Sequence, residues 1–431
     1  MCIRDRHRNS LPPSTLIWVY ATTTRVETSD PLDGISLVAL GARSGLLWRS
    51  PEVVLAGLGP TSSIGVDLSG SVADSQAHLA EMSGRDDVDL PGTGPVGFAA
   101  LNFDARLPGV AAVPEVVLGE SEGVRFITTL DASAGESADA LDRARALVGG
   151  VMDRPLAPAP EEVRLVLDRS AESWRDDVVA VARDTISNSD LEKAVFARAM
   201  TLHGSTAFDS GPIVERLAER FGSALLFSID GFIGASPELL VSRRGRTVRA
   251  HPLAGTAARG PDASADAAAV ESLRASSKDR VEHRITIDWL LAELLAFSSY
   301  VDAEPEPSVV SLENVHHLGT QVEGVLSEPP ASVLELVKAV HPTPAVGGNP
   351  QVDALALIAQ LEGFERQRYG GPSGWFDAQG NGQFAVSVRT AQIDGKTARI
   401  AAGVGVVAQS EPQAELEETQ AKFQAMLGSF L

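Results

Sequence analysis

Cysteine is almost absent from this chain, because Cys2 is the only one in 431 residues. A single cysteine cannot form an intramolecular disulfide, and it excludes a metal site built from several cysteine ligands. The sequence also has no apolar run of about 18 residues, the length needed to span a bilayer, so it predicts no transmembrane helix. Both absences agree with a protein of the reducing cytoplasm.

Basic residues are in the minority. The chain has 36 lysine and arginine residues against 57 aspartate and glutamate residues, which gives a formal net charge of −21. A surface of this sign repels phosphate backbones and anionic lipid, so the composition argues against nucleic-acid and membrane partners. Hydrophobic residues make up 44% of the chain, enough to bury a large core in one or two domains.

A basic leader, MCIRDRHRNS, precedes the acidic remainder. The apolar segment that follows it, LIWVY at residues 16–20, is too short for the core of a signal peptide. We therefore predict that residues 1–15 are a disordered or artefactual leader that takes no part in the fold.

Short apolar segments bounded by glycine, proline and aspartate alternate with helical patterns. They predict strands at residues 34–40, 46–59, 94–104, 114–119, 193–202 and 223–236, and a hairpin of residues 383–393 and 396–408 around an Asp-Gly turn. They predict helices at residues 139–152, 171–190, 277–297 and 333–340, and another with Asn349 as N-cap and Pro350 as first helical residue. This mixture predicts an α/β fold with α+β layering.

The segment DRPLAPAP, Asp153–Pro160, is the best linker candidate because it is rich in proline and has no periodic pattern. It divides the chain into a strand-rich N-terminal half, residues 16–155, and a second region, residues 160–431, on which that half would pack.

Near the end of the chain, Gly403, Gly405 and Ala408 have the spacing G-x-G-x-x-A of a dinucleotide-binding loop. That fold needs a helix and a second strand after the glycines, and too few residues follow Gly403 to form both. Glycines after a strand still expose backbone N–H groups to an anion, and a carboxylate would serve as well as a phosphate.

An acidic helix is predicted to follow from about Glu411. Glu415, Glu418 and Lys422 would share one of its faces. Leu416, Gln420, Phe423 and Leu427 would share a neighbouring face, and its apolar members would pack inward. On its own this pattern also fits a solvated helix with a Glu–Lys pair.

The predicted helix at residues 277–297 offers a second pair of acids, Asp279 and Glu282, one turn apart. Its buried stripe would hold Val281, Ile285 and Trp289. Two helices that each present a carboxylate pair could face one another around Mg²⁺, which prefers oxygen ligands.

Eight segments in order resemble those of one family of enzymes. They are FIGASPELL, PLAGTAARG, SSKDRVEHR, VHHLGT, HPTPAVGG, GWFDAQGNG, VSVRTAQI and GVGVVAQSEPQAELEETQAK. Together they resemble the chorismate-utilising enzymes: isochorismate synthase, salicylate synthase, and the chorismate-binding subunits of anthranilate and aminodeoxychorismate synthases. The match spans about residues 162–427, and the first 150 residues carry little of it.

The resemblance implies an α/β fold in which helices flank large antiparallel sheets, with chorismate as substrate and Mg²⁺ as a required metal. It makes residues 160–431 the catalytic region, and it implies a monomer with no obligatory protein partner.

Matched position by position, Glu282 and Glu418 resemble the acids that hold the metal, while Asp279 and Glu415 would act through water or as further ligands. Chorismate is a dianion that a bare cluster of acids would repel, and a bound cation reverses that effect.

Other matched positions would line the substrate pocket. Arg389 and Tyr369 resemble the anchors of the enolpyruvyl carboxylate. A carboxylate of the substrate would also contact Lys422 and the backbone of Gly403, Val404 and Gly405. The ring of the substrate would contact His317 and Thr256.

One segment departs from the family pattern. Where the family has E-P-F-D-R-G, this chain has EGFERQ at Glu362–Gln367. The acid and the arginine persist, but the proline and the final glycine are lost, so we expect this loop to differ in shape.

Formation of isochorismate adds water at C2 and expels the C4 hydroxyl, which requires a base and an acid. Lys193 matches the position of the family's base, and burial can lower the pKa of a lysine enough for this role. Glu238 matches the position of the family's acid. The plainer interpretations are a solvated lysine at a strand start, and a helix with Ser236 as N-cap, Pro237 as first residue and Glu238 in its first turn.

Lys193 also bears on which member of the family this is. Ammonia-using members, which work with a glutaminase partner, typically lack a lysine there, so Lys193 favours water as the nucleophile. Ala345, in HPTPAVGG, resembles isochorismate synthases more than salicylate synthases, which go on to release pyruvate. We predict a Mg²⁺-dependent isochorismate synthase, an isomerase of menaquinone, siderophore or related biosynthesis. Salicylate synthase is the first alternative, and an ammonia-using aminase subunit is the second.

Overall fold

The computed structural model describes residues 20–132, 139–313 and 315–430. Its strands in the N-terminal half are β1 (Tyr20–Arg25), β2 (Leu46–Arg49), β3 (Val53–Val66), β4 (Ser83–Asp86), β5 (Val96–Ala100), β6 (Gly109–Ser121) and β7 (Val124–Asp131). Those that follow are β8 (Val163–Leu167), β9 (Lys193–Gly204), β10 (Leu225–Ile229), β11 (Phe232–Ser236), β12 (Leu239–Arg244), β13 (Thr247–His251), β14 (Leu253–Ala258), β15 (Ser298–Ala303), β16 (Ser308–Ser311), β17 (Val315–Gly319), β18 (Val322–Leu326), β19 (Gly348–Asn349), β20 (Pro372–Asp377), β21 (Gly382–Val386), β22 (Thr390–Asp394) and β23 (Thr397–Val406).

The α-helices are α1 (Leu37–Ser44), α2 (Ala73–Ala80), α3 (Ala140–Asp153), α4 (Ala171–Trp174), α5 (Ala180–Ser187), α6 (Ser210–Arg220), α7 (Ala263–Ala275), α8 (Ser277–Leu295), α9 (Val333–Val340), α10 (Gln351–Leu361) and α11 (Pro412–Phe430). A 3₁₀ turn, η1 (Pro31–Gly34), precedes α1, and a π-helical turn, η2 (Arg175–Val179), joins α4 to α5.

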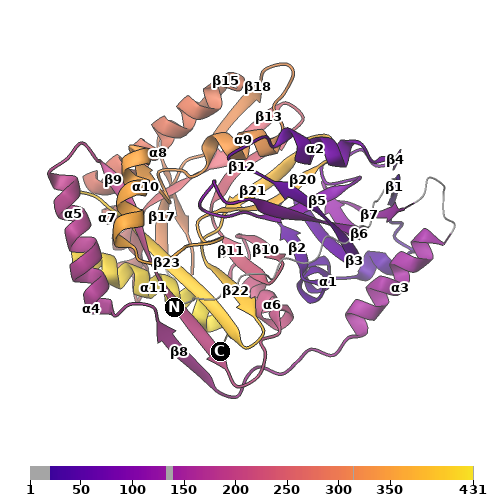
Figure 1. Cartoon of the computed structure of the whole chain (residues 1–431), viewed down its shortest axis with the longest axis horizontal. Helices are drawn as coiled ribbons and strands as arrows, with labels where there is room; N and C mark the ends of the chain where they lie inside the picture. The colour runs from indigo at the N-terminus through magenta and orange to yellow at the C-terminus, as the bar shows by residue number, and fades with distance from the viewer. Residues whose placement is uncertain (1–19, 133–138, 314, 431) are drawn as a thin grey trace, which may run out of the picture.

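Most of the strands belong to one sheet of 20 strands, in which β1 and β4 are the parallel pair and the other described pairs are antiparallel. Strands of the two halves pair directly, β2 with β10 and β5 with β20. Figure 1 shows the N-terminal strands on the right and the helices α5, α8, α10 and α11 gathered on the left. This mixed α/β architecture, with a large antiparallel sheet flanked by helices, confirms the predicted fold class.

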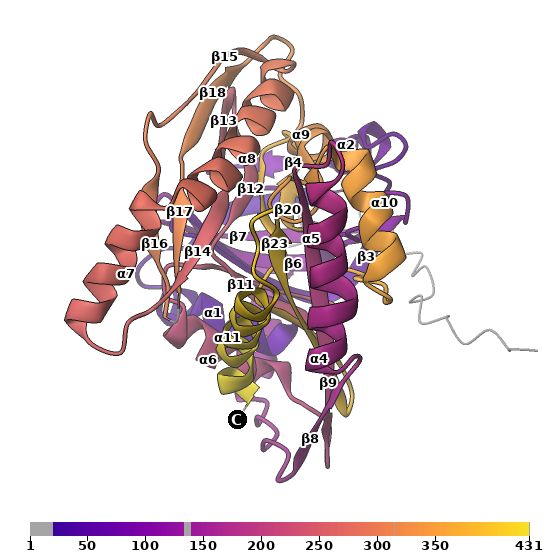
Figure 2. The same cartoon turned by 90° about the vertical axis from the view of Figure 1, so that its left-hand side faces the viewer.

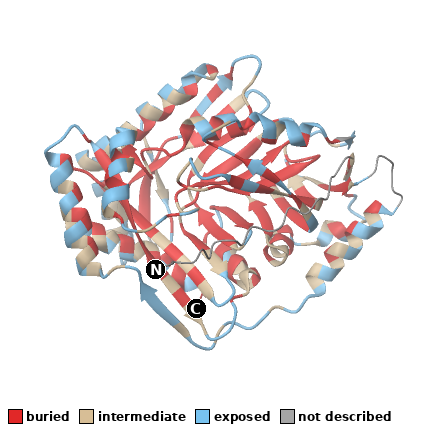
Figure 3. Ribbon diagram, viewed as in Figure 1, coloured by how far each residue is buried: buried red, intermediate tan, exposed pale blue. Residues whose placement is uncertain are grey.

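Most strands of the interior are buried, whereas the helices carry alternating buried and exposed residues, as Figure 3 shows. Helix α9 illustrates why the helices dock. Ser332 and Glu335 cap its first turn reciprocally, and the helix packs against β12 and α8. Its buried side chains are Val333, Leu334, Leu336, Val337 and Val340. Burial of each contributes about 1.5–3 kcal/mol, which fixes α9 against the sheet.

Strand β9 is the element on which the site is built. It pairs with β23 along its length, from His203 opposite Thr397 to Ala194 opposite Val406. Its first residue, Lys193, pairs with Asn349 of β19, and every residue of β9 from Lys193 to Met200 is buried. Figure 2 shows α11 beside the helix formed by α4, η2 and α5, and η2 contacts α11.

A separate three-stranded sheet, in the order β14, β17, β16, covers the other side of the site. Thr256 of β14 lies directly opposite His317 of β17, and α8 packs on β14. The two sheets therefore bring residues far apart in sequence to one place.

The predicted strand at residues 34–40 is wrong. Ser36 accepts a hydrogen bond from the N–H of Ala39 at 3.3 Å and begins α1, which ends at Gly45 with φ of 85°. A serine N-cap and a left-handed glycine C-cap outweigh the strand-like apolar composition between them.

The predicted N-cap of α10 is also wrong. Asn349 belongs to β19, and its Nδ2 donates to Glu192 Oε2 at 2.7 Å. Pro350 occupies the N-cap position, and the helix begins at Gln351. Asn349 pairs with Lys193 in the sheet, so it does not cap the helix.

The predicted buried stripe of α8 is wrong as well. Val281 is 60% exposed, and Ile285 and Trp289 are only partly buried. The buried residues are His283, Thr286, Ile287, Leu290 and Leu294. Two of these are polar, and His283 satisfies its Nε2 through Thr320 Oγ1 at 2.7 Å. An apolar pattern cannot reveal a buried face that uses hydrogen-bonded polar residues.

On α11, Phe423 and Leu427 are buried as predicted, but Leu416 is only partly buried. Glu415 and Thr419 are also buried. The helix is therefore rotated toward its acidic side relative to the predicted face.

The other predicted helices and strands occur in the structure, and β22 and β23 form the hairpin around Gly395, although the segment predicted as its first strand, residues 383–393, is divided between β21 and β22. Apart from Asp153, which ends α3, the predicted linker lies in the irregular stretch between α3 and β8, while the division into two regions stays a prediction. The predicted leader, residues 1–15, lies outside the described residues. In the described part of the chain, no helix has the length and apolarity to cross a membrane.

Candidate active site

One cavity gathers most of the predicted site residues between β9, β23, α8, α11 and the three-stranded sheet. Those that line it are Glu238, Thr256, Glu282, His317, Ala345, Tyr369, Arg389, Gly403, Val404, Gly405, Glu418 and Lys422. Lys193 reaches the same place through its contact with Glu282, whereas Asp279 and Glu415 lie outside the lining.

Lys193 is completely buried, so its interpretation as a solvated lysine is wrong. Its Nζ lies 2.9 Å from Glu282 Oε1. Gly405 makes room for this pair, because a Cβ there would lie 2.7 Å from both Lys193 Cε and Glu282 Oε1. Although burial alone would raise the pKa of Glu282, the Lys193 ammonium brings it below its usual value.

Glu238 lies in the short link between β11 and β12, so the alternative in which it begins a helix is wrong. Its Oε1 is buried and has no hydrogen-bond partner among the described residues. Burial raises the pKa of Glu238 to about 7, against the opposing effects of the Leu253 backbone and of Lys193. At neutral pH this carboxyl is therefore protonated in part of the molecules and can give up a proton.

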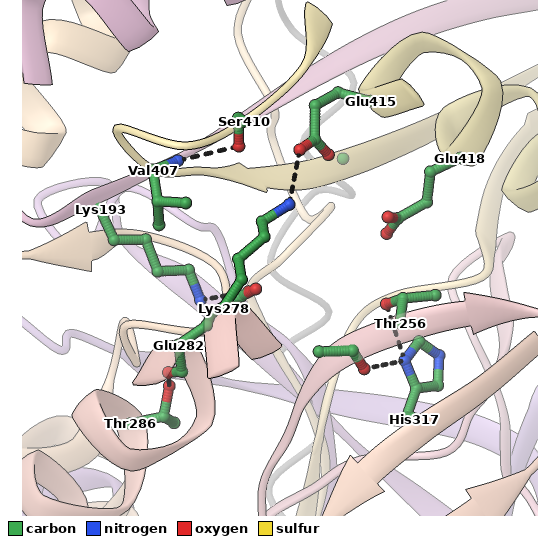
Figure 4. Close-up of polar contacts among 12 residues, drawn as sticks. Lys193, Thr256, Lys278, Glu282, Thr286, His317, Val407, Ser410, Glu415 and Glu418 are labelled. Carbon is green, nitrogen blue, oxygen red and sulfur yellow. Dashed lines mark hydrogen bonds and ion pairs between the residues drawn. The ribbon is translucent and has the colours of Figure 1, made fainter. Parts of the chain in front are cut away.

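The four acids predicted to bind metal do not meet in one cluster. Glu282 of α8 and Glu418 of α11 both face the cavity. Glu415 is turned instead toward Lys278, whose Nζ lies 3.0 Å from Glu415 Oε1, as Figure 4 shows. Asp279 accepts a hydrogen bond from the hydroxyl of Ser276, the N-cap of α8.

Burial raises the pKa of Asp279, and burial together with the nearby Glu418 raises that of Glu415. Carboxyl groups with raised pKa values lack sufficient positive charge around them. No group of three or more metal-ligating side chains occurs in the described ranges.

Mg²⁺ fits the two acids that face the cavity. It commonly takes one or two protein carboxylates and completes its shell with water and substrate oxygens. Glu282 and Glu418 supply that number from two different helices that line the cavity. Asp279 and Glu415, behind them, could contribute only through water or after a change of side-chain conformation.

Arg389, His317 and Thr256 form a chain of hydrogen bonds on one wall. Arg389 Nη2 donates to His317 Nε2 at 2.8 Å, so the ring proton of a neutral His317 belongs on Nδ1. Nδ1 lies 3.2 Å from the carbonyl oxygen of Gly255 and 3.0 Å from Thr256 Oγ1. Burial and the adjacent guanidinium hold the pKa of His317 well below its usual value, so the ring stays neutral.

Arg389 has a positive φ of 53°, which is uncommon for a residue other than glycine and costs on the order of 1 kcal/mol. The residue is buried, and its Nε has no hydrogen-bond partner within the described residues. The strained backbone directs a cation with spare donors into the cavity.

Tyr369 and Lys422 meet the glycine strand from two sides. Lys422 Nζ donates to the carbonyl oxygen of Gly403 at 2.8 Å and lies 2.6 Å from Glu418 Oε1. A Cβ on Gly403 would lie 3.2 Å from the Tyr369 hydroxyl. Burial raises the pKa of Tyr369 to about 12, so its hydroxyl keeps its proton and can donate a hydrogen bond.

The divergent EGFERQ segment forms a buried ion pair. Glu362 and Arg366 make two hydrogen bonds, at 2.6 and 2.7 Å. Arg366 also donates to the carbonyl oxygens of Val195 at 2.5 Å and Val346 at 2.8 Å, both on the cavity wall. Gly363 has φ of 80°, which proline cannot adopt, so the loop takes a shape that excludes the family's proline.

Sequence reasoning missed Lys278 and Arg366 as parts of the site. Lys278 directly precedes Asp279 in the SSKDRVEHR segment, and this adjacency is a signal that could have placed Lys278 near the predicted acids. Arg366 acts through backbone carbonyls of distant segments, and no sequence pattern reports such contacts.

The site can bind a small anion and transfer protons in a closed space. Arg389, Lys422 and the glycine backbone offer positive partners for carboxylates, and Glu238 supplies a proton donor at the cavity that Lys193 reaches through Glu282. A large antiparallel sheet flanked by helices, with such a cavity at its centre, defines an acid–base enzyme for a small anionic substrate. A family model described as chorismate binding enzyme matches residues 16–431, and the chain belongs to that family. The resemblance stated from the eight segments is thereby confirmed.

Relatives match nearly the whole chain. Isochorismate synthase MenF of Bacillus subtilis is 30% identical over 442 residues, which cover 94% of this chain and 92% of the relative. Isochorismate synthase EntC of Escherichia coli K12 is 30% identical over 392 residues, which cover 90% and 91%. The structure of MenF, the menaquinone-specific isochorismate synthase from Escherichia coli, matches with a TM-score of 0.80 and 23% identity, over 95% of this chain and 94% of that one. At that identity the structural match supports the fold alone.

Proposed function

We propose that this enzyme is a Mg²⁺-dependent isochorismate synthase, which converts chorismate to isochorismate. The observation that carries the proposal is the pair formed by Lys193 and Glu238, one a buried lysine and the other a buried carboxyl with a pKa of about 7, at one cavity. The names of the relatives that match nearly the whole chain support the same reaction.

In this proposal Lys193 is the base that takes a proton from the water that attacks C2. Glu238 gives its proton to the departing C4 hydroxyl, which leaves as water. One water enters and one leaves, so the product is an isomer of the substrate. Each proton transfer by a positioned side chain typically contributes 10²–10⁴-fold to the rate, about 3–5 kcal/mol.

The remaining residues bind and orient the substrate. Arg389 and Tyr369 would hold the enolpyruvyl carboxylate, and Lys422 with the N–H groups of Gly403–Gly405 would hold a carboxylate in the region of α11. His317 and Thr256 would border the ring, next to Ala345. Mg²⁺ held by Glu282 and Glu418, with Asp279 and Glu415 behind them, would supply positive charge for a substrate carboxylate.

Salicylate synthase is the second candidate, since it would use the same base and acid and then eliminate pyruvate. Ala345 on the cavity wall favours the synthase that stops at isochorismate, because no hydroxyl is available at this position for the later step. Lys193 argues against an ammonia-using aminase, so we propose that no glutaminase partner is needed. We place the enzyme in the cytoplasm, in menaquinone or siderophore biosynthesis.

The test is to incubate the purified enzyme with chorismate and Mg²⁺, without ammonia or glutamine, and to separate the products by chromatography beside a pyruvate assay. Isochorismate in equilibrium with chorismate, without pyruvate, is the expected result. Salicylate with equimolar pyruvate would move the assignment to salicylate synthase. Turnover that appears only with ammonia would contradict the proposal.

A further inference from the structure

Strand β8 is an edge strand with apolar side chains on both faces. It pairs only with β9 among the described strands. Leu165, Val166 and Leu167 are 48%, 38% and 42% exposed, although each is large and hydrophobic. Figures 1 and 2 show β8 at the margin of the molecule, and Figure 3 shows it exposed along most of its length. Exposed apolar edges of this kind are templates for pairing with another strand.

The free edge of β8 presents a regular set of backbone groups. The carbonyl of Glu162 accepts from Ser205 N at 2.9 Å, and the N–H of Asp168 donates to Ala199 O at 3.1 Å, both toward β9 or its extension. Because backbone direction alternates along an antiparallel strand, the even-numbered residues face β9. The N–H and C=O groups of Val163, Leu165 and Leu167 therefore point outward.

The sequence of this edge is self-complementary. From residue 164 to residue 168 it reads Arg-Leu-Val-Leu-Asp, with a cation at one end, an anion at the other and apolar residues between. An antiparallel copy centred on Val166 would place Arg164 opposite Asp168, and Leu165 opposite Leu167. We propose that β8 pairs with β8 of a second copy of this chain, which joins the two large sheets across a two-fold axis.

The register agrees with the direction of the backbone. Leu165 and Leu167, whose N–H and C=O groups point outward, would face each other as hydrogen-bonded pairs. Val166 and its copy, and Arg164 and Asp168, would be the non-hydrogen-bonded pairs, in which side chains approach most closely. The four leucines gather on one face of the joined sheet. A register shifted by one residue would lose both the hydrogen bonds and the ion pairs.

Charge makes a second copy the fitting occupant. Arg164 forms no ion pair or hydrogen bond with the described residues, so its guanidinium is free for a partner. Asp168 accepts two hydrogen bonds from Arg399 and keeps further acceptor capacity on each oxygen. The two-fold symmetry uses one surface patch on both copies. It replaces the monomer expected from the family resemblance.

The interface leaves the candidate active site accessible. The segment of β9 that pairs with β8 runs from Met200 to Gly204, whereas Lys193 lies at the opposite end of β9. Turnover should therefore be the same in monomer and dimer, and failure of this proposal is distinguishable from failure of the proposed reaction.

Disulfide trapping tests the register directly. The single native cysteine is removed as Cys2→Ser, and Val166→Cys is added. In a non-hydrogen-bonded antiparallel pair the two Cα atoms lie about 4.5 Å apart, within the range that a disulfide spans. Mild oxidation should convert V166C to a covalent dimer. The matched control is Val352→Cys, another exposed valine, on α10, which should remain monomeric under the same conditions.

Charge reversal tests the ion pairs without altering the core. Light scattering over a wide concentration range should give a mass that rises toward twice that of the chain for the wild type. R164D places like charges opposite each other and should shift the mass to that of one chain, and R164D combined with D168R should restore the dimer. Arg25→Asp, an exposed arginine on β1, is the control and should leave the mass unchanged.

A wild-type chain that stays monomeric at all concentrations would overturn the proposal. So would a dimer that survives R164D, or trapping of V352C as efficiently as V166C. Circular dichroism of each variant separates a lost interface from a lost fold.

Discussion

At the scale of single residues, the site depends on two buried ionisable groups. Lys193 is enclosed beside Glu282, and Glu238 keeps one carboxylate oxygen without a partner. A protein tolerates such groups at a cost in stability when they carry out chemistry. Their removal should therefore separate activity from fold.

Lys193→Ala should reduce turnover by at least about a hundredfold, because a positioned base contributes that much or more. Chorismate binding, followed by calorimetry, should persist because Arg389 and Lys422 remain. Lys396→Ala, at an exposed turn between β22 and β23, is the control and should retain full activity. Unchanged turnover in K193A would remove Lys193 from the mechanism.

Glu238→Gln should change the dependence of stability on pH. The pKa of Glu238 is raised from 4.5 to about 7 in the folded protein, so the folded state binds more protons than the unfolded chain between these values. Stability from this group is therefore fully present below about pH 4.5, falls as pH rises to about 7, and stays lower above it. The loss is about 3 kcal/mol, at 1.36 kcal/mol per pH unit.

The glutamine side chain does not titrate. The free energy of unfolding of E238Q, relative to that of the wild type, should therefore rise by up to about 3 kcal/mol between pH 4 and pH 8. Urea unfolding at both pH values measures the difference. Glu417→Gln, an exposed position on α11, should show no such change. Activity of the wild type should also fall as the pH rises through about 7, because Glu238 then loses the proton that it donates.

At the scale of elements, helices α8 and α11 each bring one acid to the cavity wall. Glu282→Gln or Glu418→Gln should weaken Mg²⁺ binding, since each removes one of the two carboxylates proposed to hold the metal. Because Mg²⁺ should bind the folded state only, its addition should raise the melting temperature of the wild type. This increase should be smaller in both variants. Glu417→Gln should keep the full increase. An unaltered response in E282Q and E418Q would place the metal elsewhere.

The contact between β23 and α8 admits only glycine at position 405. Gly405→Ala should abolish most activity, because its Cβ would displace Lys193 and Glu282. Gly149→Ala, in α3 with open space around its Cβ, is the control and should stabilise the protein by up to about 1 kcal/mol. Melting temperature and turnover measured on both variants separate a local clash from general intolerance of alanine.

The sequence anticipates elements whose signals are local. The β22–β23 hairpin follows from its Asp-Gly turn, and α9 from its apolar pattern, because neighbouring residues decide both. The apolar pattern does not predict the buried face of α8, where the polar residues His283 and Thr286 are buried and hydrogen-bonded. It also does not predict the helix within residues 34–40, which is determined by its two caps. Helical spacing singles out Glu282 and Glu418 as acids that could face a metal, whereas Lys193 is indicated only by the family resemblance. The pairing of Lys278 with Glu415 depends on the packing of two helices, which no local pattern reports.

At the scale of the whole molecule, the two predicted regions share one sheet. Strand β2 pairs with β10, and β5 pairs with β20, so each half supplies strand neighbours to the other. A core cluster also crosses the boundary, with Trp48, Phe98, Phe227 and Trp375 among its buried members. Separation of the halves would expose these aromatic side chains and leave strand edges unpaired.

We therefore expect the chain to unfold as one cooperative unit. In urea, tryptophan fluorescence and far-ultraviolet circular dichroism should give coincident transitions, because strand pairing and the aromatic core are lost together. Residues 160–431 expressed alone should aggregate or lack the near-ultraviolet signal of a packed core, and should gain native structure when residues 16–159 are supplied as a separate chain. Two resolved transitions, or a native-like fragment 160–431 that binds chorismate unaided, would instead mean that the pairing of β2 with β10 and of β5 with β20 adds little to stability.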